Sequence, residues 1–306
     1  MKFKASNIKK KDPDITLWHY TSPAVLWKML SGEFYATHYR FMNDSAEIVH
    51  GLMVYKRFLE DEKSLADLQF VINDLQKRDF FLWCFSEDQD NLYHWRSYTP
   101  QGGFSIGFSH NEMCDLLNNI EYDVEKLKDG SFPNYHLVQC QYKTEDDIAV
   151  FISEATAEFK KAIEDLSADD KSLLDQAVSK TKSDHFSGAI KFLNEKSPTL
   201  LSLLRDRFFV AFELQAQCPV FKNPSFEVES EHRLVVTGGD LRTQIEYIGN
   251  KPRIKIPLPE LAKCIKGVCV SPHGDVEQNH LLAEIAKERF GLDFKIHESE
   301  STFNGK

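Results

Sequence analysis

Hydrophobic positions alternate with polar ones, or run together, over several stretches of strand length. This pattern predicts β-strands, because alternate residues of a strand face one side of a sheet and an unbroken apolar run fits a strand buried on both faces. The stretches are 15–20, 32–41, 79–86, 104–108, 135–142, 233–239, 253–259, 264–272 and 293–299. The chain is therefore expected to contain a substantial sheet, with strands near both of its ends.

Between about residues 145 and 217 the pattern changes to apolar residues at steps of three and four, which is helical spacing. The spaced residues are Ile148, Ile152, Ala155, Phe159, Ile163 and Leu166. Shorter helices are predicted at 23–31, 45–59, 64–78, around Trp95, and at 277–290. Because strands lie on both sides of the helical block, we predict one α+β domain over 1–306 with a helical insertion at 145–217.

The composition is that of a folded globular protein with an acidic surface. Hydrophobic residues make up 42% of the chain, and 37 Lys and Arg stand against 47 Asp and Glu, a net charge of −10. A negative surface repels phosphates, so binding of nucleic acids or anionic membranes over a broad face is disfavoured. The net charge is still compatible with a local basic pocket.

The sequence shows no sign of export, of a membrane span or of a cysteine-based site. The basic start, 1–14, has no apolar stretch behind it, and no window approaches the ~20 apolar residues of a spanning helix. The six cysteines form no CxxC pair and no close Cys/His cluster, which disfavours a zinc site and a disulfide framework. We therefore expect a cytoplasmic protein with reduced thiols, no metal and no membrane association.

Four polar clusters at the ends of predicted elements could carry chemistry. They are 18–22 (WHYTS), 40–47 (RFMNDSAE), 84–98 with CFS at its start, and 227–233 (EVESEHR). Each also has a structural interpretation: a strand end with a helix cap, a helix N-terminus, core packing, and a solvated strand edge. On a strand, alternation places the carboxylates of Glu227, Glu229 and Glu231 on one face, where they could point into a cleft.

Taken in order, these clusters resemble a bacterial family known as domain of unknown function number 2971. The matching segments are 19–22 (HYTS), 42–47 (MNDSAE), 84–86 (CFS), Trp95 with Tyr98, 103–108 (GFSIGF) and 229–233 (ESEHR). The resemblance spans about residues 17–300 apart from the helical block. It departs from the family pattern at Ser45-Ala46, in place of a Pro-Ser type pair, and at His232, in place of an aromatic residue. The family implies no firm activity.

More remotely, the chain resembles the ADP-ribosyltransferase-like superfamily, which implies a mixed or antiparallel β core with flanking helices. This resemblance places His19 on the first core strand and a catalytic Glu231 on a late strand, with Glu229 completing an E-x-E motif. The central residue is Tyr35 in the tyrosine-type version, which we prefer slightly, or Ser86 in the serine-type version. It implies that NAD is the substrate and that a macromolecule accepts ADP-ribose, as in a toxin or an antiphage effector.

Cleavage of the nicotinamide–ribose bond develops an oxocarbenium-like cation. A carboxylate such as Glu231, bonded to the ribose 2′-hydroxyl, would stabilise that charge. Glu229 would orient or deprotonate the acceptor, and His19 would donate to a ribose hydroxyl. Tyr35 or Tyr20 would stack on nicotinamide.

The resemblance also implies a set of NAD contacts. They are His19, Tyr20, Thr21, Arg40, Asn43, Ser86, Trp95, Tyr98 and Arg233. Arg40 or Arg233 would bind the pyrophosphate in a bidentate manner, although a salt bridge to a nearby acid is an equal alternative for Arg233. Trp95 and Tyr98 either form a cleft wall or pack in the core.

Two other functions stay open at this point. Asp44, Glu47, Glu229 and Glu231 could hold Mg²⁺ for a nuclease, since carboxylates suit hard cations. A non-catalytic module could instead bind a nucleotide or a protein through an aromatic-rich cleft. The helical block could cap the site or bind a regulatory protein. The absence of GxGxxG, Walker and GxSxG motifs disfavours a Rossmann oxidoreductase, an NTPase and a serine hydrolase.

Overall fold

The computed structural model describes residues 2–4, 8–42, 79–123, 133–201, 218–238 and 241–301. Contacts within the chain divide it into two compact units. The first unit comprises Met1–Ser45, Asp79–Cys140 and Ser225–Lys306, and the second comprises Ala46–Arg78 and Gln141–Pro224. The predicted organisation as one domain with an insertion at 145–217 stays a prediction.

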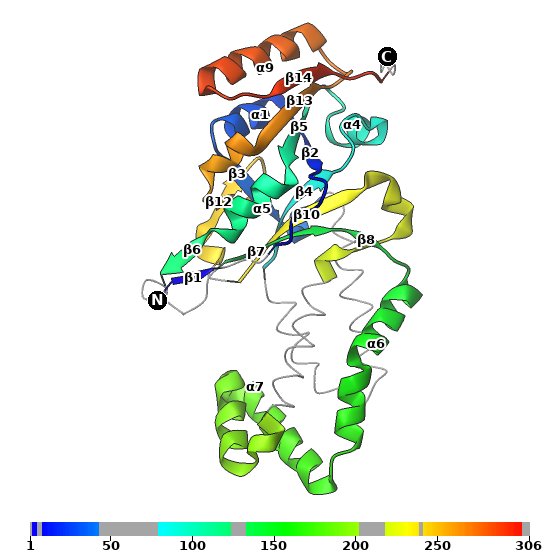
Figure 1. Ribbon diagram of the computed structural model, residues 1–306, viewed down its shortest axis with the longest axis vertical. Coiled ribbons are helices and arrows are strands. Elements are labelled where there is room, and N and C mark those ends of the chain that lie inside the picture. The colour runs from blue at the N-terminus through cyan, green and yellow to red at the C-terminus, as the bar shows by residue number, and fades with distance from the viewer. Residues whose placement is uncertain are drawn as a thin grey trace. The chain divides into compact units, whose positions relative to one another are not determined.

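A ten-stranded mixed sheet forms the framework of the first unit (Figure 1). Its main path runs β11-β12-β3-β4-β2-β5-β13-β14, and β10 lies between β4 and β7. All pairs are antiparallel except β13 with β14. The strands are β2 Thr16–Thr21, β3 Phe34–His38, β4 Phe81–Ser86, β5 Phe104–Ser109, β7 Asn134–Gln139, β10 Glu231–Thr237, β11 Ile245–Ile248, β12 Lys251–Ile256, β13 Ile265–Val270 and β14 Lys295–Glu298. This architecture confirms the predicted α+β class.

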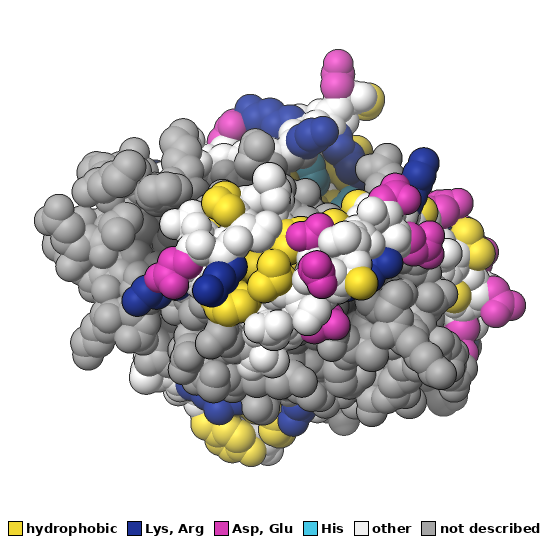
Figure 2. Space-filling view, turned by 90° about the horizontal axis from the view of Figure 1, so that it is seen from below, with side chains coloured by type: hydrophobic (Ala, Val, Ile, Leu, Met, Phe, Trp, Pro, Cys, Tyr) yellow, Lys and Arg dark blue, Asp and Glu magenta, His cyan; other side chains and the backbone are white. Residues whose placement is uncertain are grey.

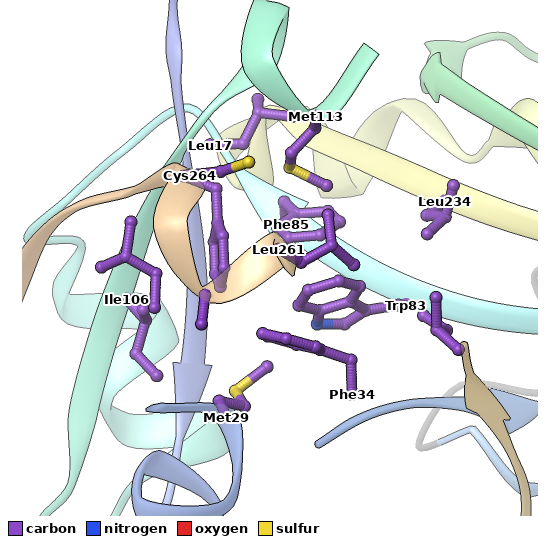
Figure 3. Packing of buried hydrophobic residues seen from close by; sticks show 14 of the residues in the cluster. Leu17, Met29, Phe34, Trp83, Phe85, Ile106, Met113, Leu234, Leu261 and Cys264 are labelled. Atoms are coloured by element: carbon purple, nitrogen blue, oxygen red, sulfur yellow. The ribbon is translucent and has the colours of Figure 1, made fainter. Parts of the chain in front are cut away.

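Helices cover one face of the sheet and close the hydrophobic core. They are α1 Pro23–Leu30, α5 His110–Asn118 and α9 Val276–Phe290; α4 Leu92–Tyr98 follows β4. Figure 3 shows how Phe34, Trp83 and Phe85 of the strands meet Met29 of α1 and Met113 of α5 in this core. Alternate residues of the strands reach this face, so the remaining residues of each strand point to the opposite face.

The first unit also contains smaller elements. These are the two-stranded pair β1 Lys2–Lys4 with β6 Glu121–Asp123 and the 3-10 turns η1 Tyr39–Phe41, η5 Pro224–Glu229, η6 Leu241–Gln244 and η7 Pro259–Cys264. The boundary between the units falls after the first residue of η5, so Pro224 belongs to the second unit and the rest of this turn to the first. The turn η5 leads directly into β10, which is the strand that carries Glu231.

The second unit contains the helices α6 Glu145–Glu164 and α7 Ala168–Lys196. A short parallel pair joins β8 Gln141–Tyr142 to β9 Phe221–Lys222, which follows η4 Cys218–Val220. Leu174, Ala177, Leu193 and Leu200 form a small buried cluster. Residues 145–164 and 168–196 are thus helical as predicted, and the rest of the predicted block, 202–217, lies outside the described residues.

Most sequence-predicted elements of the first unit are confirmed, and the helix α5 and the strands β1, β6 and β11 were missed. The missed helix α5 begins at the N-cap Ser109, whose hydroxyl accepts the backbone N–H of Glu112 at 3.1 Å. The missed strand β11 is joined to β12 by Gly249 and Asn250, both at positive φ, a hairpin signal that the sequence carried. The predicted strand 135–142 is interrupted at Cys140, because β7 ends at Gln139 and β8 begins at Gln141.

Two glycines of the GFSIGF segment allow close approach of neighbouring groups. A Cβ on Gly103 would lie 2.3 Å from the Thr21 carbonyl oxygen, and one on Gly107 would lie 2.7 Å from the Trp18 ring. Real Cβ atoms do not approach other atoms so closely, because atoms repel steeply at such distances. Packing therefore restricts positions 103 and 107 to glycine.

We expect Gly103→Ala to lower the free energy of unfolding by about 3 kcal/mol, because a backbone oxygen cannot rotate away from the added methyl group. The measurement is urea unfolding followed by tryptophan fluorescence. Gly291→Ala is the control: a Cβ there meets nothing within 4 Å, so only its φ of 63° is unfavourable. The expected cost of the control is about 1 kcal/mol. Equal losses in the two variants would contradict the steric explanation.

Candidate functional site

The sheet is split beside β4. On one edge, β4 pairs with β10 along its whole length, from Phe81 to Ser86. On the other edge, β3 pairs only with Phe81 and Leu82, and β2 pairs only with Ser86. Among the described strands, none pairs with Trp83–Phe85 on this edge. We call this unpaired stretch of β4 the β2–β3 gap.

His19 of β2 lies at the β2–β3 gap. Its Nδ1 is 2.8 Å from the carbonyl oxygen of Cys84, and its ring meets those of Trp83 and Phe85 edge-on. Because a carbonyl only accepts, Nδ1 carries the hydrogen and donates it. Burial, opposed by this hydrogen bond and assisted by the charge of Arg253, lowers the pKa of His19 to about 4.

At neutral pH His19 is therefore uncharged, and its Nε2 is a hydrogen-bond acceptor. Within the described part of the chain, Nε2 has no hydrogen-bond partner. The expectation that His19 donates to a ribose hydroxyl is corrected: the tautomer fixed by Cys84 lets Nε2 accept a hydrogen bond from that hydroxyl instead.

Tyr20 and Thr21, which follow His19, hold neighbouring segments in place. The Tyr20 hydroxyl donates to the Asp88 carbonyl at 2.9 Å and accepts the backbone N–H of Asn91 at 2.8 Å. Burial raises the pKa of Tyr20, so the hydroxyl stays protonated. Thr21 is buried against Gly103. Both residues thus position the loop after β4 and the start of β5.

Glu231 and Arg233, at the start of β10, form a buried bidentate ion pair. Arg233 Nε is 2.8 Å from Glu231 Oε1, and Nη2 is 2.9 Å from Oε2. Burial alone would lower the pKa of Arg233, but the Glu231 carboxylate raises it well above its usual value. Burial, with Glu231 nearby, raises the pKa of the Cys84 thiol well above its usual value. The salt bridge that the sequence left as an alternative for Arg233 is therefore present.

The three acids 227, 229 and 231 do not share one strand face, which corrects the expectation from alternation. Glu227 and Glu229 belong to the 3-10 turn η5, and β10 begins only at Glu231. Ser230 between them has a left-handed φ of 42°, which redirects the chain. As a result Glu227 is exposed, while Glu229 and Glu231 are buried.

The two alternatives for the central residue have different environments. The buried Ser86 hydroxyl donates to the Glu229 carbonyl at 2.8 Å and accepts the backbone N–H of Asp88 at 3.1 Å, so it holds η5 against the end of β4. Tyr35 is half-buried on β3, and its hydroxyl donates to Glu33 at 3.5 Å. Burial and then the charges of Glu246 and Glu33 raise the pKa of Tyr35.

The aromatic residues of α4 are divided between core and surface. Trp95 is fully buried, its indole N–H donates to Asp90, and it packs edge-on against Tyr20. Of the two interpretations of Trp95, packing is therefore the one that the structure supports. Tyr98 is 43% exposed and lies against the ring of His94.

The remaining predicted contacts lie at the end of β3 or beyond it. Arg40 is exposed in η1, where its Nε donates to the Tyr39 hydroxyl at 2.8 Å and its guanidinium lies over the Tyr39 ring. Asn43 lies outside the described residues, as do Asp44 and Glu47 of the proposed metal site.

His19 and Glu231 approach β4 from its two edges and belong to opposite faces of the sheet. The register pairs Glu231 with Ser86 on β10 and β4, and Trp18 with the same Ser86 on β2. Alternation then puts Glu231 on the face of Cys84 and Ser86, and His19 on the face of Trp83 and Phe85. The structure thus places both residues at β4 without joining their side chains.

Arg253 of β12 is a potential site residue that the sequence reasoning did not identify. Its side chain is half-buried, and its Nε is buried without a hydrogen-bond partner. Its charge is one of the factors that lower the pKa of His19. The segment RIKIPLP reads as an ordinary strand with a basic outer face, so no sequence signal distinguishes Arg253 from its neighbours.

Charged groups of both signs are interspersed on the surface. On the face seen in Figure 2, Lys and Arg side chains alternate with Asp and Glu among the described residues. No group of three or more His, Cys, Asp or Glu within the described ranges is arranged to hold a metal ion. Of the helices whose placement is described, none has the length and apolar character needed to cross a membrane.

Comparison with known proteins gives one result. Curated proteins and solved structures yield no match to the chain. Residues 94–234 match the family described as "Protein of unknown function (DUF2971)". The matched range contains Trp95, Tyr98, the GFSIGF segment and the ESEHR segment, and it begins after His19. The resemblance inferred from the motifs is thereby confirmed: over residues 94–234 this chain is similar to DUF2971.

Proposed function

We propose that the chain binds NAD at the β2–β3 gap, cleaves its nicotinamide–ribose bond and transfers ADP-ribose to a macromolecule. The fold behind this proposal is an ADP-ribosyltransferase-like core. A role as a toxin or an antiphage effector, and a regulatory partner bound through the helical block, belong to the same proposal. The structure shows free thiols at Cys84, Cys114, Cys140, Cys264 and Cys269, which supports a reducing, cytoplasmic setting.

The observation that carries the proposal is the state of His19 at the split of the sheet. Its Nδ1 is committed to the Cys84 carbonyl, so the ring is fixed in orientation and offers Nε2 as an acceptor. A ribose hydroxyl is a matching donor, and it would meet a preorganised group rather than a mobile one. The neighbouring rings of Trp83 and Phe85 hold the imidazole from the core side.

The cleavage step follows from the remote resemblance. The bond between nicotinamide and ribose C1′ breaks, and nicotinamide leaves with the bonding electron pair. A lone pair of the acceptor then bonds to C1′, and the acceptor's proton passes to a base, for which Glu229 is the proposed residue. An ionised Glu231 carboxylate would stabilise the positive charge on the sugar. Tyr35, Tyr20 and Tyr98 are the proposed aromatic contacts of the dinucleotide, and Arg40 and Asn43 its polar contacts.

A second candidate, nucleotide binding without turnover, is favoured by the position of Glu231. Its two carboxylate oxygens are bonded to Arg233, which offsets the negative charge that catalysis would use. It also belongs to the sheet face opposite His19. In this second candidate Glu231 and Arg233 stabilise β10, and the ligand contacts only the residues of the gap.

The test is release of nicotinamide from NAD by the purified protein, with and without a macromolecular extract. We expect Glu231→Gln to reduce release by about 100-fold or more, since it removes the charge that stabilises the cation. Glu227→Gln is the matched control, because Glu227 is an exposed carboxylate in the turn just before Glu231. Both variants are compared with wild type by urea unfolding, so that loss of fold is recognised.

The outcomes separate the candidates. Release that depends on extract and falls only in Glu231→Gln supports transfer catalysed by Glu231. Saturable NAD binding without release, by a folded wild-type protein, supports the binding module and contradicts catalysis. Neither binding nor release contradicts both. Cleavage of nucleic acid that requires added Mg²⁺ would instead support the metal-dependent nuclease.

A further inference from the structure

Arg253 of β12 lies on the sheet face opposite to that of His19. It pairs with Thr37 of β3, and Thr37 pairs with Leu82 of β4. Paired residues share a face, and so do residues two apart on one strand, so Arg253 belongs to the face of Leu82 and Cys84. His19 belongs to the other face. A ligand of Arg253 is therefore separate from a ligand that His19 binds at the β2–β3 gap.

The Arg253 guanidinium lacks the acceptor that a buried arginine ordinarily has. Its Nε is buried without a hydrogen-bond partner. Burial lowers the pKa of Arg253, and within the described part of the chain no carboxylate offsets this effect. Arg233, on the same face of the sheet, is the contrasting case, because its Nε donates to Glu231 at 2.8 Å. A buried N–H without an acceptor is unfavourable, so a bound anion would stabilise Arg253.

Glu246 of β11 is directly opposite Arg253 in the sheet but does not neutralise it. The Glu246 side chain is exposed. Burial, and then the charges of Glu246 and Glu33, raise the pKa of Tyr35, so the Glu246 carboxylate lies near the Tyr35 hydroxyl. No such effect of Glu246 acts on the pKa of Arg253, which only burial shifts. The cross-strand position that could have supplied an ion pair therefore leaves Arg253 available to a ligand.

Positive charge is concentrated around Arg253. Lys251 and Lys255 lie two residues before and after it on the same face of β12, each about 7 Å along the strand. Burial, and then the charge of Arg253, lower the pKa of Lys251, so these two cations are close together. A Cβ on Gly249 would lie 4.0 Å from Arg253 Nη2. The guanidinium thus extends toward the turn between β11 and β12, on the side of Lys251 and away from Lys255.

We propose that Arg253 and Lys251 bind a phosphate group on this face of the sheet. The planar guanidinium can donate to two phosphate oxygens at once, and the Lys251 ammonium can donate to a third. A phosphate carries up to about two negative charges, which suit two adjacent cations better than the single charge of a carboxylate does. The ligand class is inorganic phosphate or a phosphate monoester. This site is additional to the one proposed for NAD.

The test is titration calorimetry in chloride buffer with three probes, which are inorganic phosphate, glycerol phosphate and acetate. We expect Arg253→Gln to weaken binding of both phosphate probes by about 10- to 100-fold, because it removes a bidentate donor and a positive charge. Arg253→Lys should recover only part of this affinity, since an ammonium keeps the charge but not the planar pair of donors. Acetate should bind the wild type about 10-fold more weakly than phosphate.

Lys255→Gln is the matched control, because it removes one positive charge from the same face of β12 at an exposed position. Its affinities should stay within about twofold of those of the wild type. Urea unfolding of each variant shows whether the fold is kept. Arg253→Lys retains the long aliphatic stem, so it keeps the test decisive if Arg253→Gln does not fold.

The outcomes decide both the site and its ligand. Phosphate binding that falls in Arg253→Gln and persists in Lys255→Gln supports the site. Tighter binding of glycerol phosphate than of inorganic phosphate then identifies a monoester as the ligand, and the reverse identifies free phosphate. The inference is overturned if neither phosphate probe binds the wild type, if Arg253→Gln binds equally well, if Lys255→Gln loses as much, or if acetate binds as tightly as phosphate. Nicotinamide release is measured separately, so failure of one proposal leaves the other unaffected.

Discussion

Replacing Glu231 with leucine should lower the free energy of unfolding by about 3 to 5 kcal/mol. The variant leaves the Arg233 guanidinium buried, with two of its donors deprived of the oxygens now 2.8 and 2.9 Å away. A buried cation that loses its paired anion is strongly unfavourable in a protein interior. The measurement is the urea midpoint and slope, followed by tryptophan fluorescence and by circular dichroism.

The partner variants make this prediction specific. Arg233→Leu should cost a similar amount, because it removes the cation that is bonded to both oxygens of the buried Glu231 carboxylate. The double variant, with leucine at both positions, should recover at least half of the lost free energy of unfolding, because it removes the anion and the cation together. Additive losses in the double variant would show that the two side chains act independently, against the bidentate geometry.

Lowering the pH from 7 to 5 should destabilise the protein through His19 by about 2 kcal/mol. The folded pKa of His19 is about 4, below the ordinary value of 6.5. Between these two values the unfolded chain binds a proton at His19 and the folded chain does not. The stability contributed by the neutral folded ring is therefore complete above pH 6.5 and is lost as the pH falls toward 4.

His19→Gln isolates this contribution, because glutamine retains an N–H donor for the Cys84 carbonyl and does not titrate. The difference between wild type and His19→Gln should shrink by about 2 kcal/mol between pH 7 and pH 5, measured by urea unfolding at each pH. Other groups, such as His232, titrate in both proteins, so their contributions cancel in the difference between the two free energies of unfolding. A difference that stays constant across this range would mean that the His19 ring is not held neutral in the folded protein.

The sequence predicted the fold where local signals agree with tertiary packing. Ser22-Pro23 and Gly32 bound α1, and the apolar run DFFLWCFS became the central strand β4, as their patterns indicated. The ESEHR segment was misread because a single residue, Ser230, adopts a left-handed backbone that its type does not announce. Side chains alternate between two faces only within a strand, and β10 begins only at Glu231, the residue after Ser230.

The candidate site was less predictable, because its properties depend on which groups find partners. His19 was identified by type, but its role as an acceptor depends on the Cys84 carbonyl, which the split of the sheet leaves unpaired by a strand. Arg233 and Arg253 are both arginines on strands that alternate with apolar residues. One is bonded to Glu231 and the other has a buried Nε without an acceptor, and only three-dimensional neighbours decide this.

The position of β10 between β4 and β7 has a consequence for synthesis on the ribosome. The contact that closes this part of the sheet joins Ser86 to Glu229, which are 143 residues apart in sequence. At about 5–20 residues per second, the ribosome takes roughly 10 to 30 s to synthesise the chain between β4 and β10. During this time the edge of β4 that pairs with β10 has no partner. Unpaired strand edges associate readily with other chains. The nascent protein should therefore be most prone to aggregation, and most dependent on chaperones, during the interval before β10 emerges.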